Sequence, residues 1–254
     1  MNAQARSPRG TVLILGATSS IARHTAAAFA RRGFDLCLAG RDQDEVQRVA
    51  SDLNVRHGVS VQPVQFDAAD AGAADRMMDI VRDKEFGALS GVVLCFGVLG
   101  EQAIAQGDAA RSREIITINL TAAVSLLTPL ANYFEERRAG FIGTISSVAG
   151  DRGRQSNYVY GAAKGGLSIF LQGLRQRLSK AGVTVTTIKP GFVDTKMTYG
   201  LPGMFLVADP ADVGEEIARA IEKGKSVAYI PGFWRWIMLI IKLIPERVFV
   251  KLKL

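Results

Sequence analysis

The chain has 254 residues, of which 48% are hydrophobic and 22% charged. This composition excludes an intrinsically disordered chain and fits one domain with a large buried core. The net charge is +7 at pH 7, but residues 233–254 hold five Lys and Arg against one Glu, so +4 lies there and +3 on the rest. A nucleic-acid partner would need a basic stripe on the folded body, so this distribution argues against one and indicates a basic tail.

The first residues, "MNAQARSPRG", are polar and lead directly into an apolar run. We therefore expect no signal peptide and a cytoplasmic location. Both cysteines, Cys37 and Cys95, lie in apolar runs typical of buried strands, which favours free thiols over a disulfide. No residues are assigned to a metal.

Short apolar runs alternate with longer amphipathic segments along most of the chain. Strands are expected at 11–16, 34–40, 59–67, 89–97, 140–148 and 183–191, and helices at 21–32, 44–56, 71–84, 114–137 and 157–180. This alternation predicts right-handed crossovers and a doubly wound α/β fold of the Rossmann type, with one parallel sheet. We expect a single domain over residues 1–232, followed by the tail 233–254. Ligands of such sheets bind beyond the carboxyl ends of the strands.

The segment "GATSSIAR", from Gly16 to Arg23, lies between the first expected strand and helix. A bound pyrophosphate needs backbone N–H groups at a helix N-terminus and no bulky side chain nearby. Gly16 supplies the tight turn, and the small residues Ser20 and Ala22 stand where the common pattern has glycines. Taken alone, the segment fits a plain strand-to-helix turn equally well.

Arg41 follows the second expected strand, where an NAD site usually carries an acidic residue that binds the adenosine ribose. An arginine there can pair with a ribose 2′-phosphate, so the sequence favours NADP(H), with NAD(H) as the less favoured cofactor. The alternative is a solvated arginine that opens a loop.

Tyr160 and Lys164 are four residues apart in an expected helix and therefore share one face of it. A phenol has an ordinary pKa near 10 and exchanges protons poorly at neutral pH. An ammonium about 4 Å away is worth up to about 4 kcal/mol at an effective dielectric constant of about 20, which predicts a lowered pKa for Tyr160. Ser147 ends the preceding strand and can hold a carbonyl oxygen. These three residues predict a general acid and base next to a dinucleotide.

These motifs resemble the short-chain dehydrogenase/reductase family over almost the full chain. The resemblance implies hydride transfer between a nicotinamide and a carbonyl or carbinol carbon, with Tyr160 exchanging the proton on oxygen. It implies catalytic roles for Asn119, Ser147, Tyr160 and Lys164, with Asn119 holding a water of a proton relay. It implies cofactor contacts from Gly16, Thr18, Ser19, Ser20, Ile21, Arg41, Asp67, Phe96, Gly97, Tyr160, Lys164, Pro190, Gly191, Val193 and Thr195.

Two segments depart from the family pattern. The glycine turn keeps only its first glycine, and "LCFG", residues 94–97, replaces the family's Asn-Asn-Ala-Gly. Neither change removes a group that handles the proton or the hydride, so we expect the fold and the reaction type to be intact.

The substrate is expected to meet the loop after Pro190–Gly191 and the tail. That loop offers an apolar lid: Met197, Tyr199, Leu201, Met204 and Phe205. A tail helix over 233–244 would be about 18 Å long and too short for a hydrocarbon core of roughly 30 Å. Two placements stay open for it. It lies at a membrane interface with Trp234 and Trp236 at the headgroups, or it packs on the body or on a second subunit.

The segments "FGVLG", "NLTAAVS" and "YVYGAAK" and the basic apolar tail resemble one branch of the family, the reductases of polyprenyl-phosphate-linked 2-keto pentoses. This resemblance implies a lipid-linked substrate and peripheral contact with the inner face of the membrane. The alternatives are reduction of a fatty or other lipophilic ketone, or of another small molecule, and a non-catalytic NADP-binding scaffold at the membrane. Family membership implies a homodimer or homotetramer.

Overall fold

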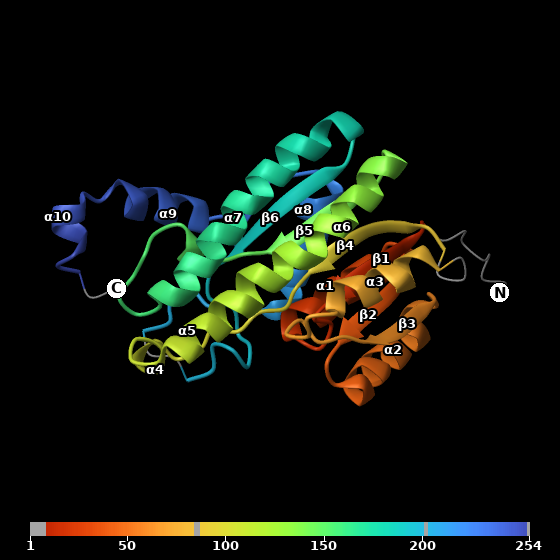
Figure 1. The fold of residues 1–254 in the computed structure, drawn as a ribbon, viewed down its shortest axis with the longest axis horizontal. Coiled ribbons are helices and arrows are strands. Elements are labelled where there is room, and N and C mark those ends of the chain that lie inside the picture. Colours follow the sequence, from red (N-terminus) through yellow and green to blue (C-terminus); the bar gives the residue numbers. More distant parts are fainter. Residues whose placement is uncertain (1–8, 84–86, 201–202, 253–254) are drawn as a thin grey trace.

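The computed structural model describes residues 9–83, 87–200 and 203–252 (Figure 1). Within these residues, seven parallel strands form one sheet in the order β3-β2-β1-β4-β5-β6-β7. The strands are β1 Thr11–Leu15, β2 Asp35–Gly40, β3 Val61–Gln65, β4 Leu89–Leu94, β5 Phe141–Ile145, β6 Thr184–Pro190 and β7 Val227–Ile230. The predicted doubly wound α/β fold is confirmed.

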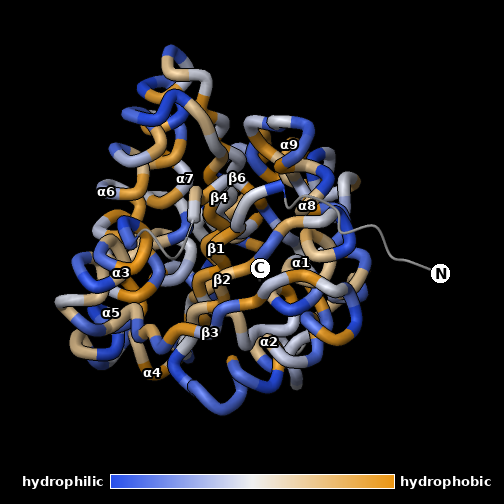
Figure 2. The backbone as a smooth tube through the Cα atoms, turned by 90° about the vertical axis from the view of Figure 1, so that its right-hand side faces the viewer, coloured by the Kyte–Doolittle hydropathy of each residue, from blue (hydrophilic) through white to orange (hydrophobic). Residues whose placement is uncertain are grey.

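Helices cover both faces of the sheet (Figure 2). On one face lie α1 Ser20–Arg31, α2 Gln43–His57 and α8 Pro210–Glu222, and on the other α3 Ala73–Arg82, α6 Ala122–Arg137 and α7 Tyr158–Leu178. Side chains of a strand alternate between its two faces, so Val12 and Ile14 of β1 pack in the α1 layer while Leu13 and Leu15 pack in the α7 layer. All four are fully buried, which explains why this strand is a continuous apolar run.

The carboxyl-end side of the sheet carries the shorter elements. These are α4 Gln102–Ala105, α5 Ala109–Ile116, the π-helical turn η2 Thr117–Thr121, the 3-10 turn η3 Val148–Gly150, α9 Trp234–Leu243 and α10 Glu246–Phe249. A further 3-10 turn, η4 Ser179–Ala181, ends α7 at the opposite side.

The sequence reading placed most elements but missed α8 and β7. The start of α8 carries recognisable signals, because Asp209 caps it by accepting a hydrogen bond from the Ala211 amide and Pro210 occupies its first turn. The β7 strand has only four residues and its alternation is short, which makes it hard to detect. Both belong to the half of the fold that carries the tail.

The helical stretch Ala109–Arg137 is long and apolar enough to cross a membrane by length and composition alone. In the structure 44% of its most apolar window is buried, and α6 packs against α3 and α7. We therefore assign it to the core of the domain. The π-helical turn within it marks the position of Asn119.

Candidate active site

A cavity of about 1210 Å³ lies at the carboxyl ends of β1, β4, β5 and β6. Small-molecule pockets usually measure about 300–1,000 Å³, so this cavity has room for more than one molecule. Its walls bring together most of the predicted site residues: Thr18, Ser19, Ser20, Ile21, Phe96, Gly97, Ser147, Tyr160, Lys164, Pro190, Gly191, Val193 and Thr195. The predicted residues Gly16, Arg41, Asp67 and Asn119 are not in its lining.

Gly16 follows β1 and lies against Phe96, in the segment that follows β4. Its φ is +84°, and a Cβ there would lie 2.7 Å from the backbone nitrogen of Phe96, so only glycine fits. The Ser19 hydroxyl accepts a hydrogen bond of 3.2 Å from the Ala22 amide and caps α1. Residues 18–21 line the cavity, and the first turn of a helix carries amides without an intrahelical partner, as a phosphate site requires.

Arg41 is exposed at the end of β2. Sequence reasoning missed a second arginine, Arg23, which lines the cavity and donates from Nε to the Thr18 carbonyl at 3.1 Å. Arg23 also forms an ion pair with Glu45, and Glu45 accepts a hydrogen bond of 2.7 Å from Arg48. Glu45 of α2 thus holds Arg23 of α1 and Arg48 of α2, while Arg41 lies between β2 and α2.

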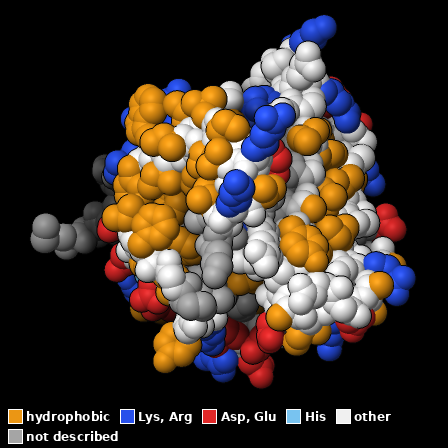
Figure 3. Space-filling view, turned by 90° about the vertical axis from the view of Figure 1, so that its left-hand side faces the viewer, with side chains coloured by type: hydrophobic (Ala, Val, Ile, Leu, Met, Phe, Trp, Pro, Cys, Tyr) orange, Lys and Arg blue, Asp and Glu red, His pale blue; other side chains and the backbone are white. Residues whose placement is uncertain are grey.

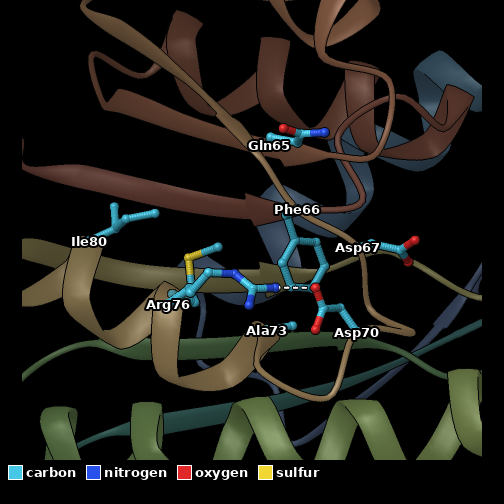
Figure 4. Close-up of a pocket in the computed structure, with 8 residues that line it drawn as sticks. Gln65, Phe66, Asp67, Asp70, Ala73, Arg76 and Ile80 are labelled. Atoms are coloured by element: carbon cyan, nitrogen blue, oxygen red, sulfur yellow. Dashed lines mark hydrogen bonds and ion pairs between the residues drawn. The ribbon is translucent and has the colours of Figure 1, made fainter.

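Asp67 lines a second, smaller cavity of about 380 Å³ between the end of β3 and α3. Its carboxylate accepts a hydrogen bond of 3.0 Å from the Ala69 amide. Figure 4 shows that Asp67 points away from the ion pair that Asp70 and Arg76 form in the same cavity. The structure thus separates Asp67 from the predicted catalytic residues.

Ser147 and Tyr160 are brought together by the contact of η3 with α7. A Cβ on Gly150 would lie 2.7 Å from the Gly165 nitrogen, so the two backbones touch where glycines allow it. The Ser146 hydroxyl fastens the end of β5 to the Lys164 carbonyl at 2.9 Å. Ser147 itself caps η3 by accepting from the Ala149 amide at 3.1 Å and makes a side-chain hydrogen bond with Tyr160.

The predicted lowering of the Tyr160 pKa by Lys164 is wrong for this structure. Burial raises the pKa of Tyr160 to about 12, and the hydrogen bond from Ser147 only partly opposes this. The ammonium of Lys164 lies 5.8 Å from the Tyr160 ring centroid and donates instead to the Ile145 carbonyl at 3.0 Å. Burial lowers the pKa of Lys164 to about 8. The two groups are neighbours, and desolvation is the largest cause of both pKa shifts.

Asn119 is buried in the π-helical turn, a feature that often marks functional sites. Its amide nitrogen donates to the carbonyls of Val98 at 2.7 Å and Ile115 at 2.9 Å, and its oxygen accepts from the Val98 amide at 3.2 Å. A Cβ on Gly97 would lie 2.6 Å from that oxygen and 3.2 Å from the Lys164 nitrogen. Asn119 therefore fixes the segment after β4 that lies against Lys164.

The tail closes one side of the cavity, which the sequence left open. Trp234 and Ile241 of α9 line it, and a Cβ on Gly191 would overlap the Trp234 indole. Of the predicted lid, Met197 and Phe205 line the cavity, whereas Tyr199 is exposed, Met204 is not in the lining and Leu201 lies outside the described residues.

The tail forms two short helices. The α9 helix ends at Leu243, and Glu246 begins α10 after a break at Pro245. Glu246 accepts a hydrogen bond of 2.6 Å from Arg152, in the loop that follows η3.

The model of the short chain dehydrogenase family matches residues 10–202 of the chain. The chain belongs to this family and is an oxidoreductase. It is 37% identical to an uncharacterized oxidoreductase of Mycobacterium tuberculosis H37Rv, over 93% of this chain and 94% of the relative. It is 34% identical to an uncharacterized oxidoreductase of Myxococcus xanthus DK1622, over 87% of each chain.

Solved structures show the same fold. A short-chain dehydrogenase from Sphingobium yanoikuyae in complex with NADPH superposes with a TM-score of 0.80 at 26% identity, covering 94% of this chain and 97% of that one. A bulky-bulky ketone specific alcohol dehydrogenase from Comamonas testosteroni gives a TM-score of 0.80 at 24% identity, covering 94% and 96%. The second match speaks for the fold alone.

The buried Lys164 generates a pH prediction. Its folded pKa of about 8 lies below the ordinary value of 10.5, so between these pH values the unfolded state binds more protons and the free energy of unfolding rises with pH. We expect the wild type to gain stability relative to Lys164→Met over this range, with a limit on the order of 3 kcal/mol. Urea unfolding from about pH 7 to 10 measures this difference.

Titration of Tyr160 above pH 10 occurs in both proteins and cancels in this comparison. Lys225→Met, which removes an exposed lysine, controls for the loss of one positive charge. A difference between wild type and Lys164→Met that stays constant with pH would show that Lys164 is not strained by burial.

Proposed function

We propose that this oxidoreductase uses NADP(H) to interconvert a carbonyl and a hydroxyl group on a lipophilic substrate. The observation that carries the proposal is the shared cavity: Ser147, Tyr160 and Lys164 line the same walls as the first turn of α1. A nicotinamide bound there would supply or accept the hydride. The remaining chemistry, binding the oxygen and moving its proton, falls to side chains of this chain.

Tyr160 is the proton donor to the substrate oxygen in this scheme. Its raised pKa keeps the phenol protonated at neutral pH, which suits donation to an oxygen that gains negative charge during reduction. Ser147, already hydrogen-bonded to Tyr160, would hold the same oxygen. Lys164 would favour the phenolate that remains, because its ammonium lies beside the ring. Asn119 would keep Lys164 in place through Gly97, in the segment after β4.

Tyr160→Phe is expected to lower kcat for ketone reduction by about 10²- to 10⁴-fold, because general acid catalysis contributes about that much. NADPH binding, followed by fluorescence, should persist. Tyr158→Phe is the matched control, since Tyr158 lies on the same helix, two residues away, and is exposed. Unchanged turnover in Tyr160→Phe would refute the catalytic assignment.

The preference for NADP(H) is supported by arginines at the adenosine end. Arg41 stands where an acidic residue would repel a 2′-phosphate, and Arg23 and Arg48 are held nearby on Glu45. A phosphate that binds Arg41 or Arg23 adds charge-assisted hydrogen bonds that NAD(H) lacks. The solved relative from Sphingobium yanoikuyae, titled as a complex with NADPH, agrees with this proposal.

Arg41→Ala is expected to weaken NADPH binding by about 10- to 100-fold, since a hydrogen bond to a charged group contributes about 1.5–3 kcal/mol. NADH binding should not change. Arg56→Ala, at the far end of α2, is the control. Arg56 forms an ion pair of 3.0 Å with Asp52 and does not line the cavity. Equal losses of NADPH and NADH affinity in Arg41→Ala would contradict the proposed role of Arg41. Arg23→Ala would then be the variant expected to distinguish the two cofactors.

A lipophilic substrate is supported by the lining beside Tyr160. Aromatic and aliphatic side chains from two segments form it, namely Phe192, Met197, Phe205, Trp234 and Ile241. Phe192, Phe205 and Trp234 contact one another, with ring centroids 5.4–5.7 Å apart. Within this class we favour a polyprenyl-phosphate-linked keto sugar, on the resemblance of the chain's motifs to that branch of the family. A free fatty ketone is the alternative.

Contact with the membrane is supported by the two faces of α9. Trp234 and Met238 are buried against the body, together with the partly buried Ile241, so the helix is part of the fold. The opposite face leaves Trp236 61%, Ile240 66% and Leu243 73% exposed. Figure 3 shows hydrophobic side chains gathered with Lys and Arg side chains at this end of the molecule. The sequence alternatives thus combine: one face packs on protein, and we propose that the other meets lipid.

Trp236→Ser/Ile240→Ser/Leu243→Ser is expected to reduce sedimentation with anionic liposomes strongly, because these side chains lose most of their apolar area. Removing the whole tail would also remove buried Trp234, so substitutions give the cleaner test. Val55→Ser/Ile169→Ser removes two exposed hydrophobic side chains elsewhere and should bind liposomes like the wild type. Wild-type binding by the triple variant would reject membrane contact through α9.

A further inference from the structure

Arg154 lies in the loop between Ser147 and Tyr160 and lines the large cavity. Its Nη2 contacts only the thioether sulfur of Met238, at 3.3 Å, and its Nε is buried without a hydrogen-bond partner. A guanidinium carries five N–H donors, and sulfur is a weak acceptor. The structure therefore partly buries a cation while leaving most of its donors without a partner among the described residues, which is costly unless a ligand engages them.

The acidic residue nearest in sequence does not satisfy Arg154. Asp151 forms a buried ion pair with Lys189 and accepts a hydrogen bond of 2.6 Å from the Tyr229 hydroxyl. Burial lowers the pKa of Arg154, and Asp151 opposes this only as a nearby charge. Arg152 differs from Arg154 in this respect. It bonds Glu246 and the Lys242 carbonyl and stacks on Phe249, so it fastens the tail.

The other charged residues in the cavity wall are accounted for. Among the described lining residues, Arg23 and Glu45 pair with each other and Lys164 donates to a carbonyl, while His24, Glu101 and Lys196 are exposed. Arg154 is thus the charged lining residue, within the described chain, that is partly buried and has no oxygen partner.

Among the described residues of the same wall, three further polar atoms are buried without partners. Two are donors, Nε2 of Gln102 and Nε1 of Trp234, and one is an acceptor, Oδ1 of Asn157. Gln102 is held by the hydrogen bond of 3.0 Å that its oxygen accepts from the Val159 amide. With the guanidinium, donors predominate, and a ligand rich in oxygen acceptors would satisfy them.

Arg154 stands apart from the phosphate turn of α1. It follows β5 and rests on α9, whereas that turn follows β1, and β4 separates the two strands in the sheet. Neighbouring strands are about 4.8 Å apart, so the ends of β1 and β5 lie roughly 10 Å from each other. Arg154 therefore serves the part of the cavity between Tyr160 and α9, beside the apolar lining.

We propose that Arg154 selects the substrate by pairing with an oxyanion on it, a carboxylate or a phosphate ester, while the carbonyl of that substrate lies at Tyr160. The inference rests on the proposed function and names its substrate class: an anionic ketone or alcohol with an apolar part. Arg154 binds and orients this substrate and takes no part in proton transfer.

Two pairs of ketones that differ in charge test this role with NADPH and the full chain. One pair is 4-acetylbenzoate and its methyl ester, and the other is 4-acetylphenyl phosphate and 4-methoxyacetophenone. In Arg154→Leu we expect kcat/KM for the charged members to fall by about 10- to 100-fold, with the neutral members unchanged. The pair with the larger fall tells whether the oxyanion is a carboxylate or a phosphate.

Arg152→Leu is the matched control, because it loosens the tail without removing the cavity's unpaired cation, and should affect charged and neutral ketones alike. If Arg154→Leu loses its cooperative unfolding transition, Arg154→Lys takes its place. Lysine keeps the charge and loses the planar fork, so part of the preference for charged ketones should remain. Equal effects on charged and neutral ketones in the folded variant would overturn the inference.

Binding of the charged ketones, read from quenching of tryptophan fluorescence, separates this inference from the proposed function. Arg154-dependent binding without any turnover would leave the oxyanion site standing and remove the reductase proposal. If neutral ketones are turned over and Arg154→Leu leaves the binding of charged ketones unchanged, the reductase proposal stands and the oxyanion site is rejected. If neither turnover nor Arg154-dependent binding is observed, both proposals fail.

Discussion

The contact of η3 with α7 is the constraint on which the site depends. Ser147 and Tyr160 come from different elements, and they meet because Gly150 and Gly165 let two backbones touch. The buried hydroxyl of Ser146 adds a second fastening, with bonds to the Lys164 carbonyl and to the Ser168 hydroxyl. A larger residue at Gly150 or Gly165 would push Ser147 away from Tyr160. These two glycines therefore determine how the serine and tyrosine hydroxyls are placed relative to each other.

Burial then sets the electrostatics of the same residues. The sequence reading used the charge of Lys164 alone and predicted an acidic phenol, but both groups are withdrawn from water and desolvation dominates. The Tyr160 phenol consequently stays protonated at neutral pH, and Lys164 loses its proton at a lower pH than an ordinary lysine does. Sequence spacing shows that two residues share a helix face, yet it cannot show how much solvent reaches them.

The fold and the core of the site were readable because their signals are local. The apolar runs of β1 to β6, the turn at Gly16 and the spacing of Tyr160 and Lys164 are each contained in a few residues. Arg154 and Gln102 escaped detection because their unpaired atoms lie in one cavity wall although the residues are far apart in the chain. Trp234 was predicted at the lipid headgroups and is instead buried in that wall. The sequence predicted a basic, apolar tail helix but left its placement open. Which face of α9 packs on the body depends on the contact between Trp234 and Gly191.

Trp234 connects the cavity with the exposed face of α9. It packs on Gly191 in the cavity wall and belongs to α9, whose other face is open to its surroundings. Thermodynamic reciprocity then applies: whatever binds the open face and changes the stability of α9 alters affinity inside the cavity, and an occupant of the cavity alters binding at the open face by the same factor. A single indole can in this way couple two events that share no contact surface.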